Sequence, residues 1–157
     1  MAIIGIVAIA KNYAIGKDGK LPWHFSADLK HFKETTIGHA VVMGSNTWRS
    51  LRKPLSNRLN IVLSRSAQID TADNLIFLRS DREAIDLAKY LKCDLFVIGG
   101  SKTYLEFAEA IDQWIVTEVP LNIEDADVFM SAGFLDGFGL SDIKELDGGL
   151  IVKRFQR

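Results

Sequence analysis

Hydrophobic residues along the chain fall into short continuous runs, separated by segments in which apolar residues recur every three or four positions. The run at residues 3–9 is apolar throughout and rich in β-branched residues, which is typical of a central strand covered on both faces. Similar runs predict further strands at residues 40–43, 59–63, 75–78, 95–98 and 114–119. Two more strands are expected at residues 140–146 and 150–155, joined by the hairpin signal Asp147-Gly148-Gly149.

Helical spacing occupies the intervals between these strands. It predicts a helix that opens with Ser26 as its N-cap, on which Asp28 and Phe32 share a face because they are four residues apart. Other helices are expected at residues 46–51, 81–91 and 102–110. Strands that alternate with helices and end in a hairpin indicate an α/β sandwich with a mostly parallel sheet and an antiparallel edge.

The segment at residues 11–23 lacks any sustained periodicity and contains turn formers such as Gly16, Gly19 and Pro22. It is therefore expected to be a long, mobile loop. The sequence shows no internal repeat, low-complexity stretch or linker. We therefore expect residues 1–157 to form a single domain.

Composition and charge narrow the class of protein. Of the 157 residues, 48% are hydrophobic and 25% are charged, the balance of a globule with one packed core. A net charge of -1 gives no field that would hold a nucleic acid. Cys93 is alone, so no intrachain disulfide and no zinc site are expected, and the apolar start is too short to cross a bilayer. These features favour a cytoplasmic protein without a metal, nucleic-acid or membrane partner.

Neither the dinucleotide fingerprint Gly-x-Gly-x-x-Gly nor a phosphate-binding loop is present. Two other junctions could hold a nucleotide, because at residues 98–102 and 44–48 a strand runs through glycine into the start of a helix. Taken alone, the junction at residues 98–102 is more often a tight strand-to-helix turn, because glycine is ordinary in turns. Arg65 follows a strand between two serines, an arrangement that suits a ribose phosphate or, alternatively, a solvated loop.

Asp28 is the carboxylate with the clearest chemical interest. On an inward helix face beside Leu29 and Phe32 it would be costly to bury without a partner. The alternative is an exposed aspartate in the first helical turn, which favours the helix dipole and is more common. His24, His31 and His39 have neither metal-ligand spacing nor a nucleophile to serve, so no catalytic role is assigned to them.

The order and spacing of many short motifs resemble those of bacterial dihydrofolate reductases over nearly the whole chain. These motifs are Ala8, Ile15-Gly16, Leu21-Pro22-Trp23, Asp28-Leu29, Phe32, Gly44, Thr47-Trp48, Ser50-Leu51, Pro54-Leu55, Arg58, Asn60, Leu63-Ser64-Arg65, Ile98-Gly99-Gly100, Tyr104 and Thr117. The resemblance implies a three-layer sandwich around a mostly parallel, eight-stranded sheet with an antiparallel C-terminal strand. It also implies reduction of 7,8-dihydrofolate to tetrahydrofolate by NADPH, and inhibition by antifolates.

The resemblance assigns the substrate site. Asp28 would accept hydrogen bonds from the pterin, with Thr117 supporting it, Trp23 placing a water and the Leu21 loop closing above. Arg58 would bind the glutamate α-carboxylate of the substrate. The apolar lining would consist of Ile6, Ala8, Leu29, Phe32, Leu51 and Ile98.

The resemblance also assigns the cofactor site. Ala8, Ile15, Gly16 and Tyr104 would lie near the nicotinamide, and the Gly99-Gly100 peptide is expected to be cis. The phosphates and the adenosine ribose would be held by Gly44, Ser45, Asn46, Thr47, Leu63, Ser64, Arg65, Gly99, Gly100, Ser101, Lys102 and Thr103.

Some positions depart from the family pattern. Ser45 and Asn46 replace residues that are often basic in the family, and Lys102 replaces a frequent Arg. Arg65 and Lys102 nevertheless keep positive charge for the 2′-phosphate of the cofactor, which favours NADPH over NADH. Residues 127–129 resemble the acidic segment that braces the Leu21 loop, with Val128 where Thr is usual.

Two rival functions remain at this point. One is a related reductase that acts on a ribosylaminopyrimidine, against which Asp28 and Arg58 argue, and the other is a silent nucleotide-binding module. A monomeric enzyme that binds dihydrofolate is the expectation.

Overall fold

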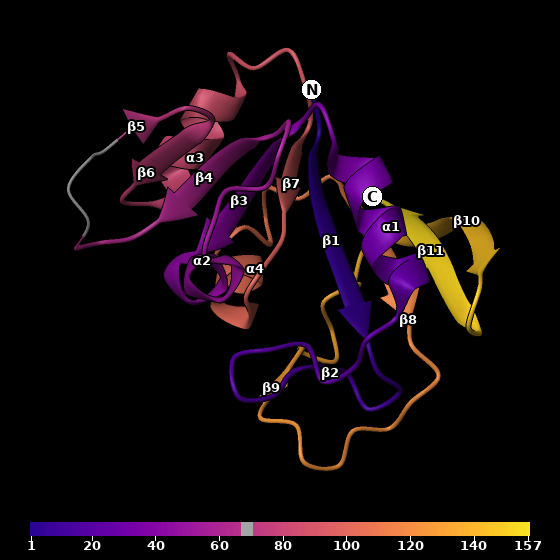
Figure 1. Cartoon of the computed structure of the whole chain (residues 1–157). Helices are drawn as coiled ribbons and strands as arrows, with labels where there is room; N and C mark the ends of the chain where they lie inside the picture. Colours follow the sequence, from indigo (N-terminus) through magenta and orange to yellow (C-terminus); the bar gives the residue numbers. More distant parts are fainter. Residues whose placement is uncertain (67–70) are drawn as a thin grey trace.

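A twisted sheet forms the centre of the molecule in the computed structural model, which describes residues 1–66 and 71–157 (Figure 1). Within those residues the sheet has nine strands in the order β10-β11-β8-β1-β7-β3-β4-β6-β5. In that order they are β10 (Gly139–Leu146), β11 (Leu150–Gln156), β8 (Gln113–Glu118), β1 (Ile3–Ile9), β7 (Leu95–Val97), β3 (Ala40–Gly44), β4 (Leu59–Leu63), β6 (Leu75–Leu78) and β5 (Thr71–Ala72).

The six strands from β8 to β6 run parallel, whereas β11 pairs antiparallel with β8, and β10 with β11. This arrangement confirms the predicted mostly parallel sheet with its antiparallel C-terminal edge. The eight predicted strands are all present. The ninth, β5, pairs antiparallel with β6 and spans two residues, too few to show any hydrophobic period.

Helices cover both faces of the sheet, which confirms the three-layer sandwich. On one face, Phe32 of α1 (Ser26–Thr36) and Trp48 of α2 (Ser45–Leu51) pack in one apolar cluster with Val41. On the other face, α3 (Asp81–Ala88) and α4 (Ser101–Glu106) contribute Ala84, Ala88 and Tyr104 to a second cluster with Val42. Neighbouring β3 residues thus face opposite layers, as strand geometry requires.

Three helix ends differ from the prediction. Ser26 is the first helical residue of α1 and not its N-cap, because Phe25 takes the extended N-cap position. Helices α3 and α4 end earlier than expected, at Ala88 and Glu106. Beyond them the chain continues in tight turns, with Leu91 N–H bonded to Ala88 O and Ala110 N–H to Phe107 O. Such turns keep apolar residues at nearly helical spacing, so periodicity cannot separate them from a helix.

The segment predicted as one long loop contains a short strand, β2 (Ala14–Gly16), that pairs with β9 (Val128–Phe129). Its partner comes from the segment that follows β8, far along the chain (Figure 1). The long loop is therefore tied at one point to the 127–129 segment. Among the described residues, no helix is long and apolar enough to span a membrane.

Gly5 of β1 lies where the central strand packs closely against the Trp114 ring. A Cβ built on Gly5 would lie 2.5 Å from Cε3 and Cζ3 of Trp114, a ring that also packs on Phe134 at 5.0 Å between centroids. Because this ring has little room to move, we expect Gly5→Ala to lower the free energy of unfolding by about 1–3 kcal/mol. Urea denaturation followed by circular dichroism measures this change.

The matched control is Gly139→Ala on β10, where the nearest atom to an added Cβ is Gln156 O at 3.9 Å. We expect that variant to differ from the wild type by at most about 1 kcal/mol. Equal stabilities of the two variants would show that the contact with Trp114 does not limit residue size at position 5.

Candidate functional site

One stripe of α1 carries the polar residues that the helix buries. Asp28 is 9% exposed and Thr36 is fully buried, and Phe32 lies between them at the same four-residue spacing. Residues four apart stand one above the other on a helix, so the three side chains form a line that faces the sheet. Leu29, which was expected to line the same site, is 49% exposed. It lies at the edge of this stripe.

Asp28 lies in the first turn of α1, and its backbone N–H bonds to Phe25 O at 3.1 Å. Burial raises the pKa of its carboxyl group, and the nearby indole N–H of Trp23 lowers it in part. That N–H is buried and meets no acceptor at hydrogen-bonding geometry among the described residues. It therefore favours the carboxylate through proximity, while keeping its donor capacity for another polar group.

Arg58 is fixed at the other end of the stripe. Its Nη1 donates to Thr36 Oγ1 at 3.0 Å, and its Nε donates to Ser56 O at 2.9 Å. Its guanidinium carbon lies 6.0 Å from the centroid of the Phe32 ring. The side chain is 5% exposed, and burial lowers the pKa of its guanidinium.

The helix therefore separates two buried groups of opposite charge by a fixed distance. Thr36 follows Asp28 by eight positions, which corresponds to about 12 Å along a helix axis. In the described part of the chain neither Asp28 nor Arg58 forms an ion pair. The arrangement suits an elongated ligand with hydrogen-bond donors at one end and a carboxylate at the other.

Apolar side chains fill the space between these ends. Phe32 packs in one cluster with three of the residues predicted to line the site, Ile6, Leu51 and Ile98. Thr117 is buried on β8, opposite Ala8 of β1 in the register of the two strands. The Thr117 hydroxyl makes no direct hydrogen bond to Asp28 in the described structure. Leu21, the predicted loop residue of the site, is 49% exposed.

The two strand-to-helix junctions lie next to each other, because β3 and β7 are neighbours in the sheet. Gly44 N–H donates to Gly99 O at 2.9 Å, and the Gly99-Gly100 peptide is cis, as the resemblance led us to expect. A Cβ on Gly44 would lie 2.7 Å from Thr103 Oγ1. A Cβ on Gly100 would instead meet only Thr47 Oγ1, at 3.9 Å, so this stretch of backbone stays open to a ligand.

Other predicted cofactor residues continue along the same carboxyl edge of the sheet. Leu63 ends β4 beside Gly44, and Ser64 and Arg65 follow it, with Arg65 exposed. Ser45 and Asn46 open α2, and Asn46 Oδ1 accepts a hydrogen bond from Arg49. Ser101 and Lys102 open α4, where Lys102 lies 4.0 Å from Glu106. Ligands of open parallel sheets bind in the crevice at this edge.

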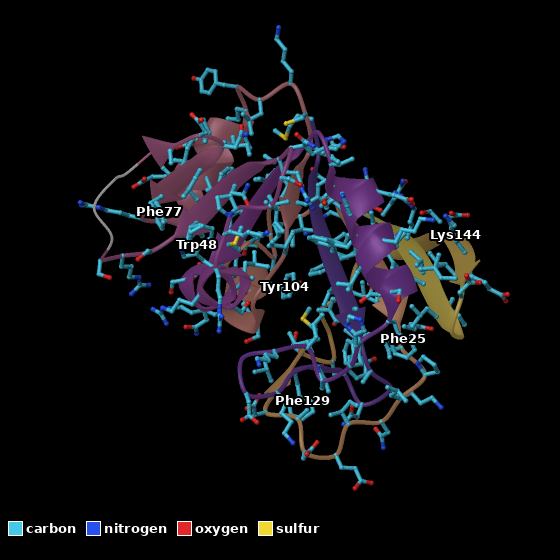
Figure 2. All side chains as sticks on the ribbon, viewed as in Figure 1. Phe25, Trp48, Phe77, Tyr104, Phe129 and Lys144 are labelled. Carbon is cyan, nitrogen blue, oxygen red and sulfur yellow. The ribbon has the colours of Figure 1, made fainter. Side chains whose placement is uncertain are left out.

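Tyr104 connects the two parts of the candidate site. Its hydroxyl donates to Ile6 O at 2.7 Å, and burial raises the pKa of the phenol. Its backbone N–H bonds to Gly100 O at 3.0 Å. Figure 2 shows Tyr104 at the centre of the molecule, between the strands and α4.

In the loop at residues 11–23, Ile15 packs against the core cluster that contains Tyr104, and acidic residues hold the loop in place. Lys17 pairs with Asp125, and Asp18 N–H donates to Asp127 Oδ2 at 3.0 Å. Asp127 N–H bonds to Gly16 O at 3.1 Å. The 127–129 segment thus contacts the loop as the resemblance implied, with Val128 opposite Gly16.

Sequence reasoning missed Thr36 and the pair of Lys17 and Asp125. Thr36 accepts a hydrogen bond from Arg58, which lies 22 residues away in the sequence. Lys17 pairs with Asp125, which lies 108 residues away. The helical period puts Thr36 on the same stripe as Asp28, and this spacing is the one feature of the sequence that could have identified Thr36 as a site residue. In residues 1–66 and 71–157 no group of three or more His, Cys, Asp or Glu side chains could hold a metal ion.

Comparison with known proteins places this geometry in a family. The sequence model of dihydrofolate reductase matches residues 2–144. The dihydrofolate reductase of Haemophilus influenzae is 35% identical over 124 residues, covering 79% of this chain and 75% of that protein. A solved structure, "Dihydrofolate reductase from Enterococcus faecalis complexed with NADP(H)and RAB-propyl", matches with a TM-score of 0.88 at 28% identity and covers 99% of this chain and 96% of that chain.

Longer relatives contain the matching region as one part. The bifunctional dihydrofolate reductase-thymidylate synthase of Glycine max is 40% identical over 147 residues, covering 80% of this chain and 27% of that protein. The chain spans 24% to 27% of the length of this and three other curated relatives.

Fold and candidate site together define an α/β protein in which many of the predicted site residues lie along the carboxyl edge of a mostly parallel sheet. The chain belongs to the dihydrofolate reductase family, a family of oxidoreductases.

Burial of Asp28 makes stability depend on pH. The folded state raises the pKa of this carboxyl above 3.8, so the ionised form opposes folding. Below pH 3.8 the group is protonated in both states and the penalty is absent. As pH rises through the folded pKa the penalty becomes complete. We therefore expect Asp28→Asn to stabilise the protein more at pH 7 than near pH 4, in urea denaturation at both values.

Trp23→Phe provides the matched second variant. It removes the indole N–H that favours the carboxylate, so the pKa of Asp28 should rise further and the pH-dependent part of the penalty should grow. A stability difference between Asp28→Asn and wild type that is the same at both pH values would contradict a buried, ionising Asp28.

Proposed function

We propose that the chain catalyses the NADPH-dependent reduction of 7,8-dihydrofolate to 5,6,7,8-tetrahydrofolate, with hydride transfer to C6 and protonation at N5. The observation that carries this proposal is the α1 stripe, on which a buried acid and a buried guanidinium lie at opposite ends of an apolar line. A pterin with an amino group and a ring N–H suits the acid, and a glutamate carboxylate suits the guanidinium. Membership of the dihydrofolate reductase family supports the same substrate.

In this proposal Asp28 binds and orients the pterin. A carboxylate presents two acceptor oxygens to a fork of two donors, which fixes the ring in its plane. Its raised pKa keeps part of the population protonated at higher pH than an ordinary aspartate would. The Asp28 side chain forms no hydrogen bond to a second ionisable side chain in the described structure that could relay a proton, so within this proposal we assign the final proton transfer to water.

Trp23 and Thr117 support this acid. The buried indole N–H of Trp23 has no partner among the described residues, which fits a water or a substrate atom beside Asp28. Thr117 lies buried on β8 across from Ala8, where a hydroxyl can accept from the pterin amino group. Leu21 lies in the loop that Asp127 braces, and we assign it to closing the crevice against water.

The residues along the carboxyl edge fit a dinucleotide phosphate. The open backbone of Gly100 lies beside the hydroxyl of Thr47, and Thr103 packs under Gly44. Hydroxyl and amide donors suit a pyrophosphate, while the exposed cations Arg65 and Lys102 suit a 2′-phosphate. Bound NADPH would supply the hydride for the reaction. The similar Enterococcus faecalis enzyme was solved in complex with NADP(H), which supports this choice of cofactor.

A single domain over residues 1–157, a monomeric state, a cytoplasmic location and inhibition by antifolates remain parts of the proposal.

The decisive experiment follows absorbance at 340 nm with NADPH and 7,8-dihydrofolate. We expect the wild type to turn over and to be blocked by an antifolate, and Asp28→Asn to lose roughly 10²- to 10⁴-fold in turnover. Because the acid favours a protonated substrate, part of this loss should be recovered at lower pH. Circular dichroism checks that the variant remains folded.

Three outcomes would overturn the proposal. Wild-type turnover by Asp28→Asn at neutral pH would remove Asp28 from the site. Turnover of a ribosylaminopyrimidine in place of dihydrofolate would favour the related reductase, and no absorbance loss at any pH would favour a silent binding module.

Thr36 is a positioning residue for Arg58. Replacing it should therefore affect substrate binding and leave the chemical step unchanged. Thr36→Val removes the oxygen that accepts from Arg58 Nη1, so the guanidinium loses its fixed direction. We expect the KM for dihydrofolate to rise about tenfold while kcat stays within about twofold, because Arg58 contacts a part of the substrate that does not react. Steady-state kinetics at saturating NADPH measure both constants.

Thr36→Ser keeps the hydroxyl and is the matched control, expected to retain the wild-type KM. A fall in kcat with an unchanged KM in Thr36→Val would contradict the role of Arg58 in binding the remote carboxylate.

A further inference from the structure

A second hollow lies on the α1 face of the sheet, outside the residues of the candidate active site. It is a pocket of about 450 Å³ under the C-terminal half of the helix. Its floor is apolar and consists of Ile4, Phe96, Ile115 and Val152, all buried in one core cluster. Gln113 and Ile4 lie near the first residues of β8 and β1, so the pocket is at the opposite end of these strands from Thr117 and Ala8.

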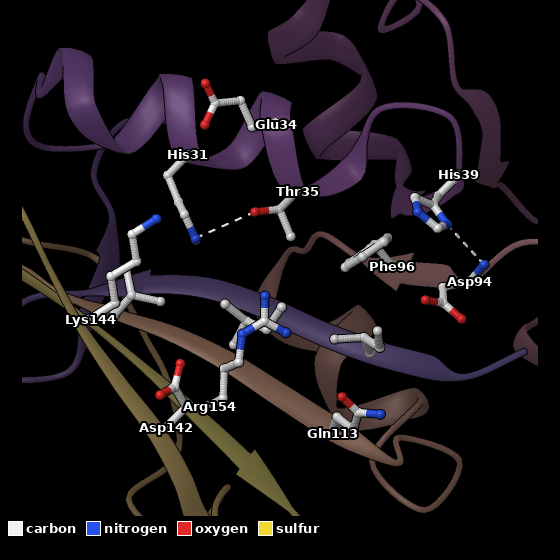
Figure 3. Close-up of a pocket in the computed structure, with 13 residues that line it drawn as sticks. His31, Glu34, Thr35, His39, Asp94, Phe96, Gln113, Asp142, Lys144 and Arg154 are labelled. Atoms are coloured by element: carbon white, nitrogen blue, oxygen red, sulfur yellow. Dashed lines mark hydrogen bonds between the residues drawn. The ribbon is translucent and has the colours of Figure 1, made fainter.

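Polar side chains surround this floor. Figure 3 shows Lys144 and Arg154 reaching from β10 and β11 toward His31 and Thr35 on α1. His31 and Thr35 are one helical turn apart, with 3.4 Å between Nε2 and Oγ1. A helix that faces a sheet usually fills this space with apolar side chains. The polar pair leaves an open pocket instead.

The two cations of the pocket, Lys144 and Arg154, are only partly balanced by carboxylates. In the part of the chain that is described, neither Lys144 nor Arg154 forms an ion pair. Two of the three carboxylates at the pocket are engaged elsewhere: Asp94 accepts from Ala2 N–H at 2.9 Å, and Glu34 lies 3.9 Å from Lys30 on the exposed side of α1. Asp142 remains, opposite Arg154 in the strand register. Two cations thus face one uncommitted carboxylate.

The charges around the pocket change the pKa of His31. Burial lowers the pKa of its imidazole, Lys144 and Arg154 lower it further, and Glu34 opposes them. The remaining titratable groups at the pocket are Asp142 on β10 and the pair His39 and Asp94, in which His39 Nδ1 accepts from Asp94 N–H at 3.0 Å. The cations therefore outweigh the carboxylates at this ring, so a negative charge placed there would be attracted.

We propose that the pocket binds a small aromatic carboxylate, with its ring on the floor of Ile4, Phe96 and Val152 and its carboxylate between Lys144 and Arg154. The flat floor carries the edge-to-face pair of Phe96 and His39, 5.5 Å between centroids, which suits a further aromatic ring. Two cations from adjacent strands suit the two oxygens of a carboxylate. This site is independent of the reaction proposed above, and it uses none of the residues assigned to that reaction.

The test is a titration of the folded protein with naphthalene-2-carboxylate, followed by nuclear magnetic resonance of the histidine rings. We expect the His31 ring signal to shift to saturation and the pKa of His31 to rise, because the bound anion offsets the two cations. By linkage, binding tightens as pH falls through that pKa. Lys144→Gln combined with Arg154→Gln should weaken binding about tenfold or more.

The control variant, Arg82→Gln combined with Lys89→Gln, removes one arginine and one lysine charge from α3 and its C-cap on the other face of the sheet. It should bind like the wild type. Lys144→Arg combined with Arg154→Lys keeps both charges and should retain binding, which guards against loss through misfolding. Naphthalene-2-carboxamide, which has no charge, should bind at least about tenfold more weakly.

Several results would overturn the proposal. These are a His31 shift that does not saturate, equal binding of the acid and the amide, or full binding after loss of both cations. A shift of the Trp23 indole signal without one at His31 would place the ligand in the candidate active site and would equally reject the second pocket.

Discussion

The structure depends on holding a carboxylate and a guanidinium in its interior without pairing them with each other. Taking either charge out of water is unfavourable, and an ion pair between them would offset much of that cost. Here α1 keeps them about two helical turns apart, a spacing set by the rise of the helix. Each group instead has neutral neighbours: Trp23 for Asp28, and Thr36 with Ser56 O for Arg58. In the proposed function, these two unpaired charges bind the two ends of the substrate.

The sheet supplies the rigid support for this arrangement. The buried residues of its central strands β1, β7, β3 and β4 are apolar except for Asn60, and the carboxyl ends of these strands form one continuous edge. The α1 stripe of Asp28, Phe32 and Thr36 packs through Phe32 in one cluster with Ile98, which follows β7 at this edge, and the glycine junctions form the next section of the edge. Tyr104 fastens the two parts together, because its hydroxyl binds β1 at Ile6 and its amide binds Gly100. A displacement of β1 or of the Gly99-Gly100 junction would therefore be transmitted to the other through Tyr104.

The sequence predicts the core of this fold well, and the reason is physical. Runs such as residues 40–43 are buried on both faces, so their continuous apolar character shows directly in the sequence. The helical period placed Asp28 and Phe32 on one face but left open whether Asp28 is buried. It did not predict the exposure of Leu29 either, since the period fixes only the approximate edge of a buried stripe. What the sequence leaves open depends on partners far along the chain, such as those of Arg58 and Lys17. A resemblance to a family helps because it transfers the positions of such partners together, as it did for the glycine junction.

Helix α1 shows how function and stability compete in one element. Phe32 is its only residue among the described core clusters, while Leu29 and Ile37 are exposed. Its inward positions are instead occupied by polar residues: Asp28 and Thr36 are buried, and His31 and Thr35 line the second pocket. An element held by few apolar contacts opens locally at a lower free energy than a well-packed one. The polar residues that the proposed function assigns to α1 therefore reduce the apolar packing of this helix, and the strands beneath it supply the stability that the helix lacks.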